Sequence, residues 1–155
     1  MYKVVVADSS CLIALSKIGQ LQILEQLFGH ILIPSAVFHE VVTRGAGRPG
    51  AGEVANAEWI ETCEVQDQLA VNALKLALGA GEAEAIILAS ERRADFLILD
   101  DWQARQMALG LSLSVIGTVA VLTKAVDKGI LQDLSGMLQR LRQAGFHFMS
   151  LPASG

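Results

Sequence analysis

The sequence predicts an α/β domain with a mostly parallel sheet. Short runs of aliphatic and β-branched residues recur without polar alternation, which is typical of strands covered on both faces. Segments with apolar residues at helical spacing separate these runs. The chain has 155 residues, of which 52% are apolar and 18% are charged, and this composition excludes a disordered chain. Together these observations favour one folded α/β unit.

The apolar runs are expected to form the strands. The first run, Val4 to Ala7, is β-branched, and Pro34 closes the second run. Residues 60–65 alternate only weakly between apolar and polar side chains, which favours a short exposed strand. The expected strands cover residues 4–7, 31–33, 60–65, 96–99 and 113–116, with a last edge strand at 146–149.

Helices are expected between these strands. Gly29 is a typical stop for the apolar stripe at 21–28, and Ser35 is a suitable N-cap for the helix that follows. The glycine-rich segment at 44–52 predicts a flexible loop, and glycines at 79–81 separate two further helices. The expected helices cover residues 12–18, 21–28, 35–42, 68–78, 82–93, 102–109, 118–126 and 134–141.

Charge and cysteine content narrow the function classes. A net charge of −4 argues against a basic clamp that holds nucleic acid by bulk charge, but not against an enzyme that acts on nucleic acid. Cys11 and Cys63 are too few for a disulfide framework. No apolar run reaches the roughly 18 residues of a membrane span, and the apolar stretch at the N-terminus is too short for a signal peptide. We therefore expect a single cytoplasmic domain over residues 1–155, without a membrane partner.

Two aspartates follow apolar runs directly. Asp8 comes after the first run, and Asp100 comes after the run at 96–99. In a parallel sheet, ligands bind beyond the carboxyl ends of the strands. If the two strands are neighbours, the carboxylates repel each other unless a cation or proton lies between them. Hard oxygen ligands suit Mg²⁺ or Mn²⁺. Either aspartate alone is better explained as a helix cap, whereas the pair favours a shared site.

Three glutamates are further candidates for this site. Glu40 lies in an otherwise apolar helical segment, where it faces either solvent or the edge of the sheet. Glu82 and Glu84 open the helix after the glycines at 79–81, and acids in a first helical turn interact favourably with the helix dipole. Their spacing of two residues places them on different faces, so we expect only one of them to enter the site.

These acids occur in segments that resemble a known family. The segment VADSSCLIAL at 6–15 resembles the opening motif of PIN-domain proteins, and Glu40 follows at the family's usual distance. The segments at 81–86 and 97–101 resemble the third and fourth acidic segments. Their order and spacing are similar to an uncharacterised PIN-like subfamily close to the VapC-type toxins. The resemblance extends from the first strand to about Gly145.

The resemblance implies a three-layer α/β/α sandwich whose five-stranded parallel sheet has the order 3-2-1-4-5. It also implies Mg²⁺- or Mn²⁺-dependent cleavage of RNA phosphodiester bonds, as in the toxin of a toxin–antitoxin pair. The implied partners are an RNA substrate, an antitoxin protein and a second copy of the chain. The alternative function is a non-catalytic PIN-like module that binds nucleic acid or protein.

The resemblance also assigns roles to residues. The implied catalytic residues are Asp8, Glu40, Glu84 and Asp100. The implied metal ligands are Asp8, Glu40, Asp100 and one of Glu82 and Glu84, with Asp101 as an outer ligand. Ser9 or Ser10 is expected to orient Asp8 or a bound water. Ile98 departs from the commoner toxin pattern, which has Thr or Ser at this position.

The glycine-rich loop carries two arginines. Arg44 and Arg48 are candidate contacts to the substrate backbone, and the alternative is a mobile surface loop. The loop lacks the Gly-Lys-Ser/Thr ending of a phosphate-binding P-loop. With four proposed site acids set aside, the remaining chain is neutral, so the acidic excess is compatible with a phosphate substrate.

Overall fold

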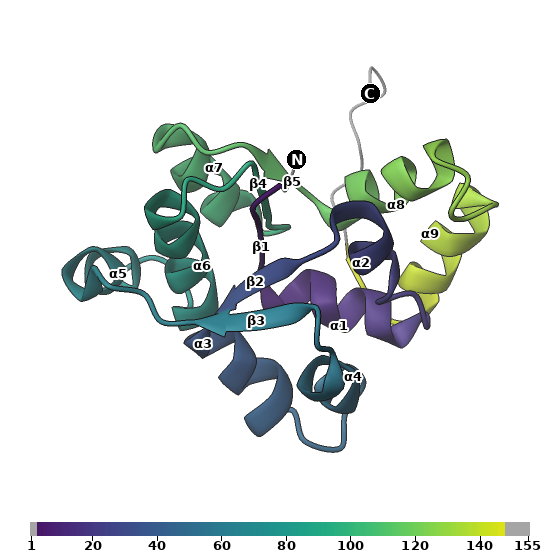
Figure 1. Ribbon diagram of the computed structural model, residues 1–155, viewed down its shortest axis with the longest axis horizontal. Coiled ribbons are helices and arrows are strands. Elements are labelled where there is room, and N and C mark those ends of the chain that lie inside the picture. Colours follow the sequence, from purple (N-terminus) through teal and green to yellow (C-terminus); the bar gives the residue numbers. More distant parts are fainter. Residues whose placement is uncertain (1–2, 148–155) are drawn as a thin grey trace.

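The computed structural model describes residues 3–147. Within them, five parallel strands form one sheet in the order β3-β2-β1-β4-β5, which confirms the predicted topology (Figure 1). The strands are β1 (Val5–Ala7), β2 (Ile31–Pro34), β3 (Ile60–Cys63), β4 (Phe96–Ile98) and β5 (Val115–Ile116). Strand β1 lies at the centre of the sheet, between β2 and β4. The carboxyl ends of these three strands therefore lie side by side at one edge of the sheet.

Strand residues alternate between two hydrophobic cores. Val5 and Ala7 belong to one core, whereas Val6 belongs to the other together with its pairing partners Leu32 and Leu97. Successive side chains of a strand point to opposite faces, so an unbroken apolar run is buried only when both faces are covered. The uninterrupted runs in the sequence reflect this two-sided burial.

Helices cover both faces of the sheet (Figure 1). The first core packs under α1 (Ser9–Lys17), α2 (Ile23–Phe28), α8 (Thr118–Asp127) and α9 (Leu134–Gln143). The second packs under α5 (Gln68–Leu74), α6 (Ala80–Glu91) and α7 (Trp102–Gly110). After β2 the chain forms α3 (Ser35–Phe38), the π-helix η1 (His39–Thr43) and α4 (Ala51–Asn56).

Several predicted boundaries differ from the structure. The helix predicted at 35–42 is α3 followed by the wider π-helical turn η1. The loop predicted at 44–52 ends at Gly50, whose positive φ of 99° starts α4, a helix that the sequence pattern did not indicate. The helix predicted at 68–78 ends at Leu74, and a turn follows it. Of the edge strand predicted at 146–149, residues 146 and 147 have no regular structure, and the rest lies outside the described residues.

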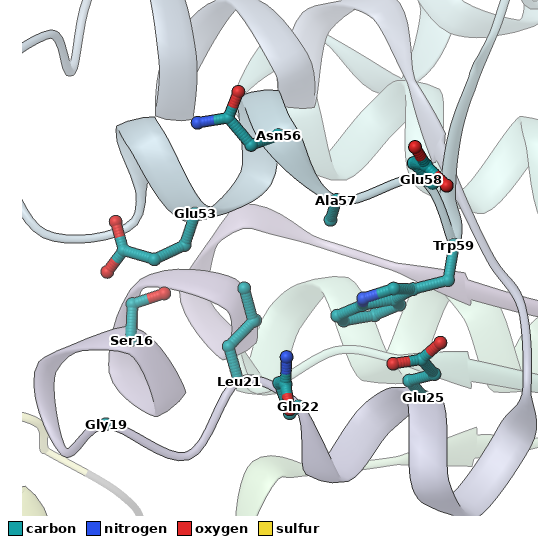
Figure 2. Close-up of a pocket in the computed structure, with 10 residues that line it drawn as sticks. All are labelled: Ser16, Gly19, Leu21, Gln22, Glu25, Glu53, Asn56, Ala57, Glu58 and Trp59. Carbon is teal, nitrogen blue, oxygen red and sulfur yellow. The ribbon is translucent and has the colours of Figure 1, made fainter.

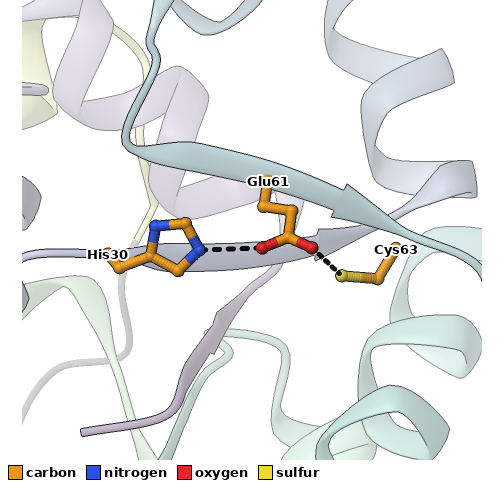
Figure 3. A network of polar contacts seen from close by, with 3 residues as sticks. All are labelled: His30, Glu61 and Cys63. Carbon is orange, nitrogen blue, oxygen red and sulfur yellow. Dashed lines mark hydrogen bonds and ion pairs between the residues drawn. The ribbon is translucent and has the colours of Figure 1, made fainter. Parts of the chain in front are cut away.

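The edge strand β3 is tied to the loop before β2 by polar contacts (Figure 3). Glu61 pairs with His30 Nε2 at 3.0 Å through Oε1, and its Oε2 accepts a contact from Cys63 Sγ at 3.7 Å. The hydrogen bond from His30 lowers the pKa of Glu61. Both partners are about half exposed, so this pair contributes little to stability. Charged residues on an edge strand disfavour pairing with another sheet.

Within residues 3–147, no helix is both long and apolar enough to cross a membrane.

Candidate active site

The predicted acids gather around the carboxyl ends of β1 and β4. Asp8 joins β1 to α1, and its backbone N–H donates to the carbonyl of Ile98 at 3.1 Å. Asp100 lies two residues beyond β4, and η1 brings Glu40 to the same edge from the segment after β2. The first turn of α6 completes the site, where β1, α1, α3 and α6 approach one another (Figure 1).

Asp8 is the most buried of these acids, with 2% of its surface exposed. Its Oδ1 atom is buried and has no hydrogen-bond partner among the described residues. Desolvation, together with the charges of Glu82, Glu40 and Asp100, raises the pKa of Asp8 from 3.8 to about 7, against a backbone hydrogen bond from Ser9 that lowers it. A carboxylate in such a place requires a proton or a cation.

Glu40 connects α1 to α6. Its Oε2 accepts a hydrogen bond from Ser9 Oγ at 2.9 Å, and its Oε1 accepts one from the backbone N–H of Gly81, also at 2.9 Å. The helix dipole of α6 favours a negative charge at this end. A Cβ atom at residue 81 would lie 2.5 Å from Oε1 of Glu40. Only glycine therefore allows this approach. The Ser9 hydroxyl contacts Glu40, whereas its predicted partner was Asp8 or a bound water, and that role stays a prediction.

Asp100 is held by Thr118, the first residue of α8. Its Oδ1 accepts from the Thr118 backbone N–H at 2.8 Å, and its Oδ2 accepts from Thr118 Oγ1 at 2.6 Å. Desolvation raises the pKa of Asp100, against the lowering effects of these two bonds and of the Arg105 charge. Thr118 is fully buried. It lies 18 residues from Asp100, and the sequence showed it only as the start of a helix, so its contribution to the site was missed.

Arg105 is a second residue that sequence reasoning did not assign to the site. A Cβ atom at Gly117 would lie 2.9 Å from Nη1 of Arg105 and 3.0 Å from Oδ1 of Asp100, so both side chains border this glycine. The guanidinium is thus the positive charge placed beside Asp100. Only the position of Arg105 on α7 relative to β5 reveals that it lies near Asp100.

Glu82 and Glu84 have different partners, in agreement with their expected placement on different faces. Glu84 accepts a hydrogen bond from the backbone N–H of Ala36 at 3.0 Å, at the start of α3. Glu82 accepts from the N–H of Gly79 at 3.2 Å. Desolvation raises the pKa of Glu82, and the charges of Asp101 and Glu40 raise it too. Of the two glutamates, Glu82 is the one whose charge acts on Asp8.

The other predicted residues lie at the margin of this group. Asp101 is exposed and caps α7 by accepting from the Ala104 N–H at 2.9 Å. Ser10 is the half-buried second residue of α1. Arg44 and Arg48 are exposed, one at the end of η1 and the other in the loop before α4. A role for these arginines in substrate binding stays a prediction.

The acids of the site offer the type of donor atom that a divalent cation requires. Carboxylate oxygens are the donors that Mg²⁺ and Mn²⁺ prefer, and the unpartnered Oδ1 of Asp8 is a free acceptor for such an ion. As the side chains of residues 3–147 lie, however, no three His, Cys, Asp or Glu residues form a group that could hold a metal ion. Glu40, Asp100 and Glu84 each accept a hydrogen bond from a donor of their own. The donor chemistry fits a divalent cation, and binding would require these side chains to converge further.

Comparisons with known proteins agree with this architecture. A family model described as "DUF3368: PIN domain" matches residues 4–151. Among solved structures, the chain is similar to a PilT N-terminus domain protein from the hyperthermophilic archaeon Sulfolobus solfataricus P2. The two share 19% sequence identity with a TM-score of 0.54, and the match covers 81% of this chain and 93% of the other. At this identity the likeness concerns the fold. The comparison with curated proteins gave no match.

Proposed function

Because the chain belongs to the PIN-domain family, whose members are usually nucleases, we propose that it is a metal-dependent ribonuclease that hydrolyses RNA phosphodiester bonds. The observation that carries this proposal is the environment of Asp8. A buried carboxylate oxygen without a hydrogen-bond partner lies among the charges of Glu82, Glu40 and Asp100, at the edge of the sheet where parallel α/β folds bind their ligands.

The residues that would hold the cation are Asp8, Glu40 and Asp100. The charge of Glu82 raises the pKa of Asp8, and the charge of Glu40 raises the pKa of Glu82. When bound, Mg²⁺ or Mn²⁺ supplies a hydroxide nucleophile at neutral pH and stabilises the charge on the phosphate. Partial release of Glu40 from Gly81 would free a carboxylate oxygen for this purpose.

The chain's own residues position these carboxylates. Ser9 restrains one oxygen of Glu40, and Thr118 restrains both oxygens of Asp100. Two fixed contacts limit the rotamers of Asp100, so less ordering is needed when a ligand binds. Arg105 adds a positive charge beside Asp100, where it would attract a substrate phosphate.

The test is an RNase assay on unstructured RNA with Mn²⁺ or Mg²⁺ and with a chelator. We expect cleavage by the wild-type chain that requires the metal and is lost in the Asp8→Asn variant. Asp127→Asn, the same substitution at the exposed end of α8, is the matched control and should cleave like wild type. Equal cleavage by wild type and Asp8→Asn would refute the proposal, because the activity would then arise elsewhere.

The second candidate is a PIN-like module that binds RNA or protein without cleaving. It is favoured by the finding that no three site acids within residues 3–147 converge as a metal needs. RNA binding measured by a gel-shift assay, with no cleavage at any Mn²⁺ concentration tested, would support this alternative over the nuclease.

A toxin role is the finer part of the proposal. We propose that the chain acts as the toxin of a toxin–antitoxin pair, with an antitoxin protein and a second copy of itself as partners. Induced expression should then arrest growth, and Asp8→Asn should not. Growth at the wild-type rate during induction, with active enzyme demonstrated in the lysate, would contradict the toxin role and leave the nuclease intact.

A further inference from the structure

A pocket of about 690 Å³ lies far along α1 from the acidic site. Trp59, which immediately precedes β3, and Ser16, near the end of α1, both line it (Figure 2). The pocket thus opens at the amino edge of the sheet, whereas Asp8 lies at the carboxyl edge. Its ten lining residues, drawn in Figure 2, are Ser16, Gly19, Leu21, Gln22, Glu25, Glu53, Asn56, Ala57, Glu58 and Trp59.

The size and lining of the pocket suit a small molecule. Ligand pockets typically enclose about 300–1,000 Å³ and combine an apolar wall with a few polar groups. Here Leu21 and Ala57 supply apolar surface, and the indole ring of Trp59 lies between Ala57 and Glu25 in Figure 2. A half-buried tryptophan face is also the aromatic surface that attracts cations most strongly.

All charged residues that line the pocket are acidic. Glu25, Glu53 and Glu58 line it from α2, α4 and the segment after α4, and none of the ten lining residues is Lys, Arg or His. Only Glu53 has a short contact within the described chain, where its Oε1 accepts from the Gly50 N–H at 3.3 Å. Acidic side chains held around a concave surface raise the local concentration of cations.

A buried hydroxyl gives independent evidence for a ligand. Ser16 is 9% exposed, and its Oγ has no hydrogen-bond partner among the described residues. It lines the pocket opposite Trp59, with its hydroxyl directed inward towards Leu21 (Figure 2). A buried hydroxyl without a partner costs about 1–3 kcal/mol. A ligand N–H group that donates to Ser16 would remove this cost.

We propose that this pocket binds a small aliphatic cation that carries ammonium or guanidinium groups, such as a linear polyamine. Its positive groups would face the three glutamates and the ring of Trp59, one N–H would donate to Ser16, and its methylene chain would contact Leu21. The inference is independent of the ribonuclease proposal, because it uses none of the residues of that site.

The test is a fluorescence titration with spermidine and agmatine as probes. The chain has two tryptophans, so the Trp102→Phe variant, changed at a residue that is 58% exposed, leaves Trp59 as the reporter. We expect a saturable change in Trp59 emission. In that background, Glu25→Gln with Glu53→Gln should weaken binding about tenfold or more, while Glu64→Gln, an exposed glutamate outside the pocket, should not. Far-UV circular dichroism checks that each variant is folded.

Three further arms make the result decisive. Asp8→Asn should bind the probes like wild type, because the acidic active site is elsewhere. Octane-1,8-diol, which has a similar chain without charge, should not bind. Ser16→Ala should raise the melting temperature and lower the affinity, a combination that a purely structural serine would not produce.

The proposal is overturned by any of four results. These are no saturable change up to about 10 mM probe, equal binding in the double glutamate variant, equal binding of the diol, and loss of binding in Asp8→Asn with the pocket intact.

Discussion

The proposed chemistry depends on Asp8. Because this carboxyl group is buried, its ionised form lowers the stability of the fold. Its pKa of about 7 in the folded chain, against an ordinary value of 3.8, means that the folded state holds a proton more tightly than the unfolded state. Stability therefore falls as pH rises between these two values. The cost is fully present above pH 7, where the site is meant to bind a cation.

The first prediction follows from this linkage. In chelator-treated protein, Asp8→Asn should raise the melting temperature at pH 8, since it removes a buried charge that costs a few kcal/mol at about 1.4 kcal/mol per pKa unit. The difference in melting temperature between Asp8→Asn and wild type should be small at pH 4, grow up to about pH 7 and then level off. Thermal unfolding at several pH values measures it, with Asp127→Asn as the control. A difference that does not vary with pH would contradict the assigned pKa shift.

The buried hydroxyl of Thr118 holds Asp100 although the two residues are 18 positions apart in the sequence. Thr118→Val keeps the shape and the backbone N–H but removes the hydroxyl bond to Oδ2 of Asp100. We expect a loss of about 1 kcal/mol in unfolding free energy together with weaker Mn²⁺ binding and slower cleavage. Thr118→Ser should restore most of the binding and cleavage. Calorimetric titration with Mn²⁺ measures the effect, and an affinity unchanged in Thr118→Val would show that this bond does not position Asp100.

At the scale of elements, the site depends on how closely η1 approaches α6. The π-helical turn carries Glu40 and ends before Gly45, and a Cβ at Gly45 would collide with the carbonyl of Val41. At Gly81, in the first turn of α6, a Cβ would meet the carboxylate of Glu40 instead. π-helical turns are frequent at functional sites because the extra residue redirects a side chain. Here the redirected side chain is Glu40.

A pair of glycine variants tests this packing. Gly→Ala within a helix ordinarily stabilises by about 1 kcal/mol. Gly52→Ala in α4 should do so, because nothing lies within 4 Å of the added methyl group. Gly81→Ala should instead fail to stabilise and should reduce cleavage, because it displaces Glu40 from the α6 N-terminus. Denaturant unfolding and the RNase assay give both readouts, and equal stabilisation by the two changes would refute the close approach.

At the scale of the whole molecule, the two edges of the sheet carry different candidate sites. The carboxyl edge carries the buried Asp8 and the half-buried Glu82 and Asp100, and all three have raised pKa values. The amino edge carries the pocket with its exposed glutamates and the buried Ser16. The parallel arrangement separates them, because every strand runs from one edge to the other. Ligands of the two edges should therefore act independently on stability.

Metal binding should stabilise the whole chain. A ligand that binds only the folded state adds about 2.7 kcal/mol at a concentration of 100 times Kd. Mn²⁺ should raise the melting temperature of wild type, a chelator should reverse the rise, and Asp8→Asn should show no rise. Differential scanning calorimetry measures these shifts. A rise of the same size in Asp8→Asn would place the metal outside the proposed site.

Most of the fold could be predicted because its evidence is local. The apolar runs at β1 and β4 show two-sided burial by their composition alone, and the strand order followed from the resemblance to PIN domains. The helix α4 escaped prediction because glycine and alanine dominate its surroundings, and its start depends on the conformation of Gly50 and its contact with Glu53. In α9, Leu141 is fully buried, whereas Leu134, Met137 and Leu138 are half-buried.

The sequence by itself determined which acids stand at the ends of strands, since a carboxylate that follows a buried run is carried to the edge of the sheet. Only the tertiary structure decided which partner each side chain meets. Glu84 reaches Ala36, Glu40 reaches Gly81, and Asp100 meets Thr118. These contacts join residues 18 to 48 positions apart. Such contacts depend on how whole helices pack against the sheet, and local sequence patterns carry no information about that packing.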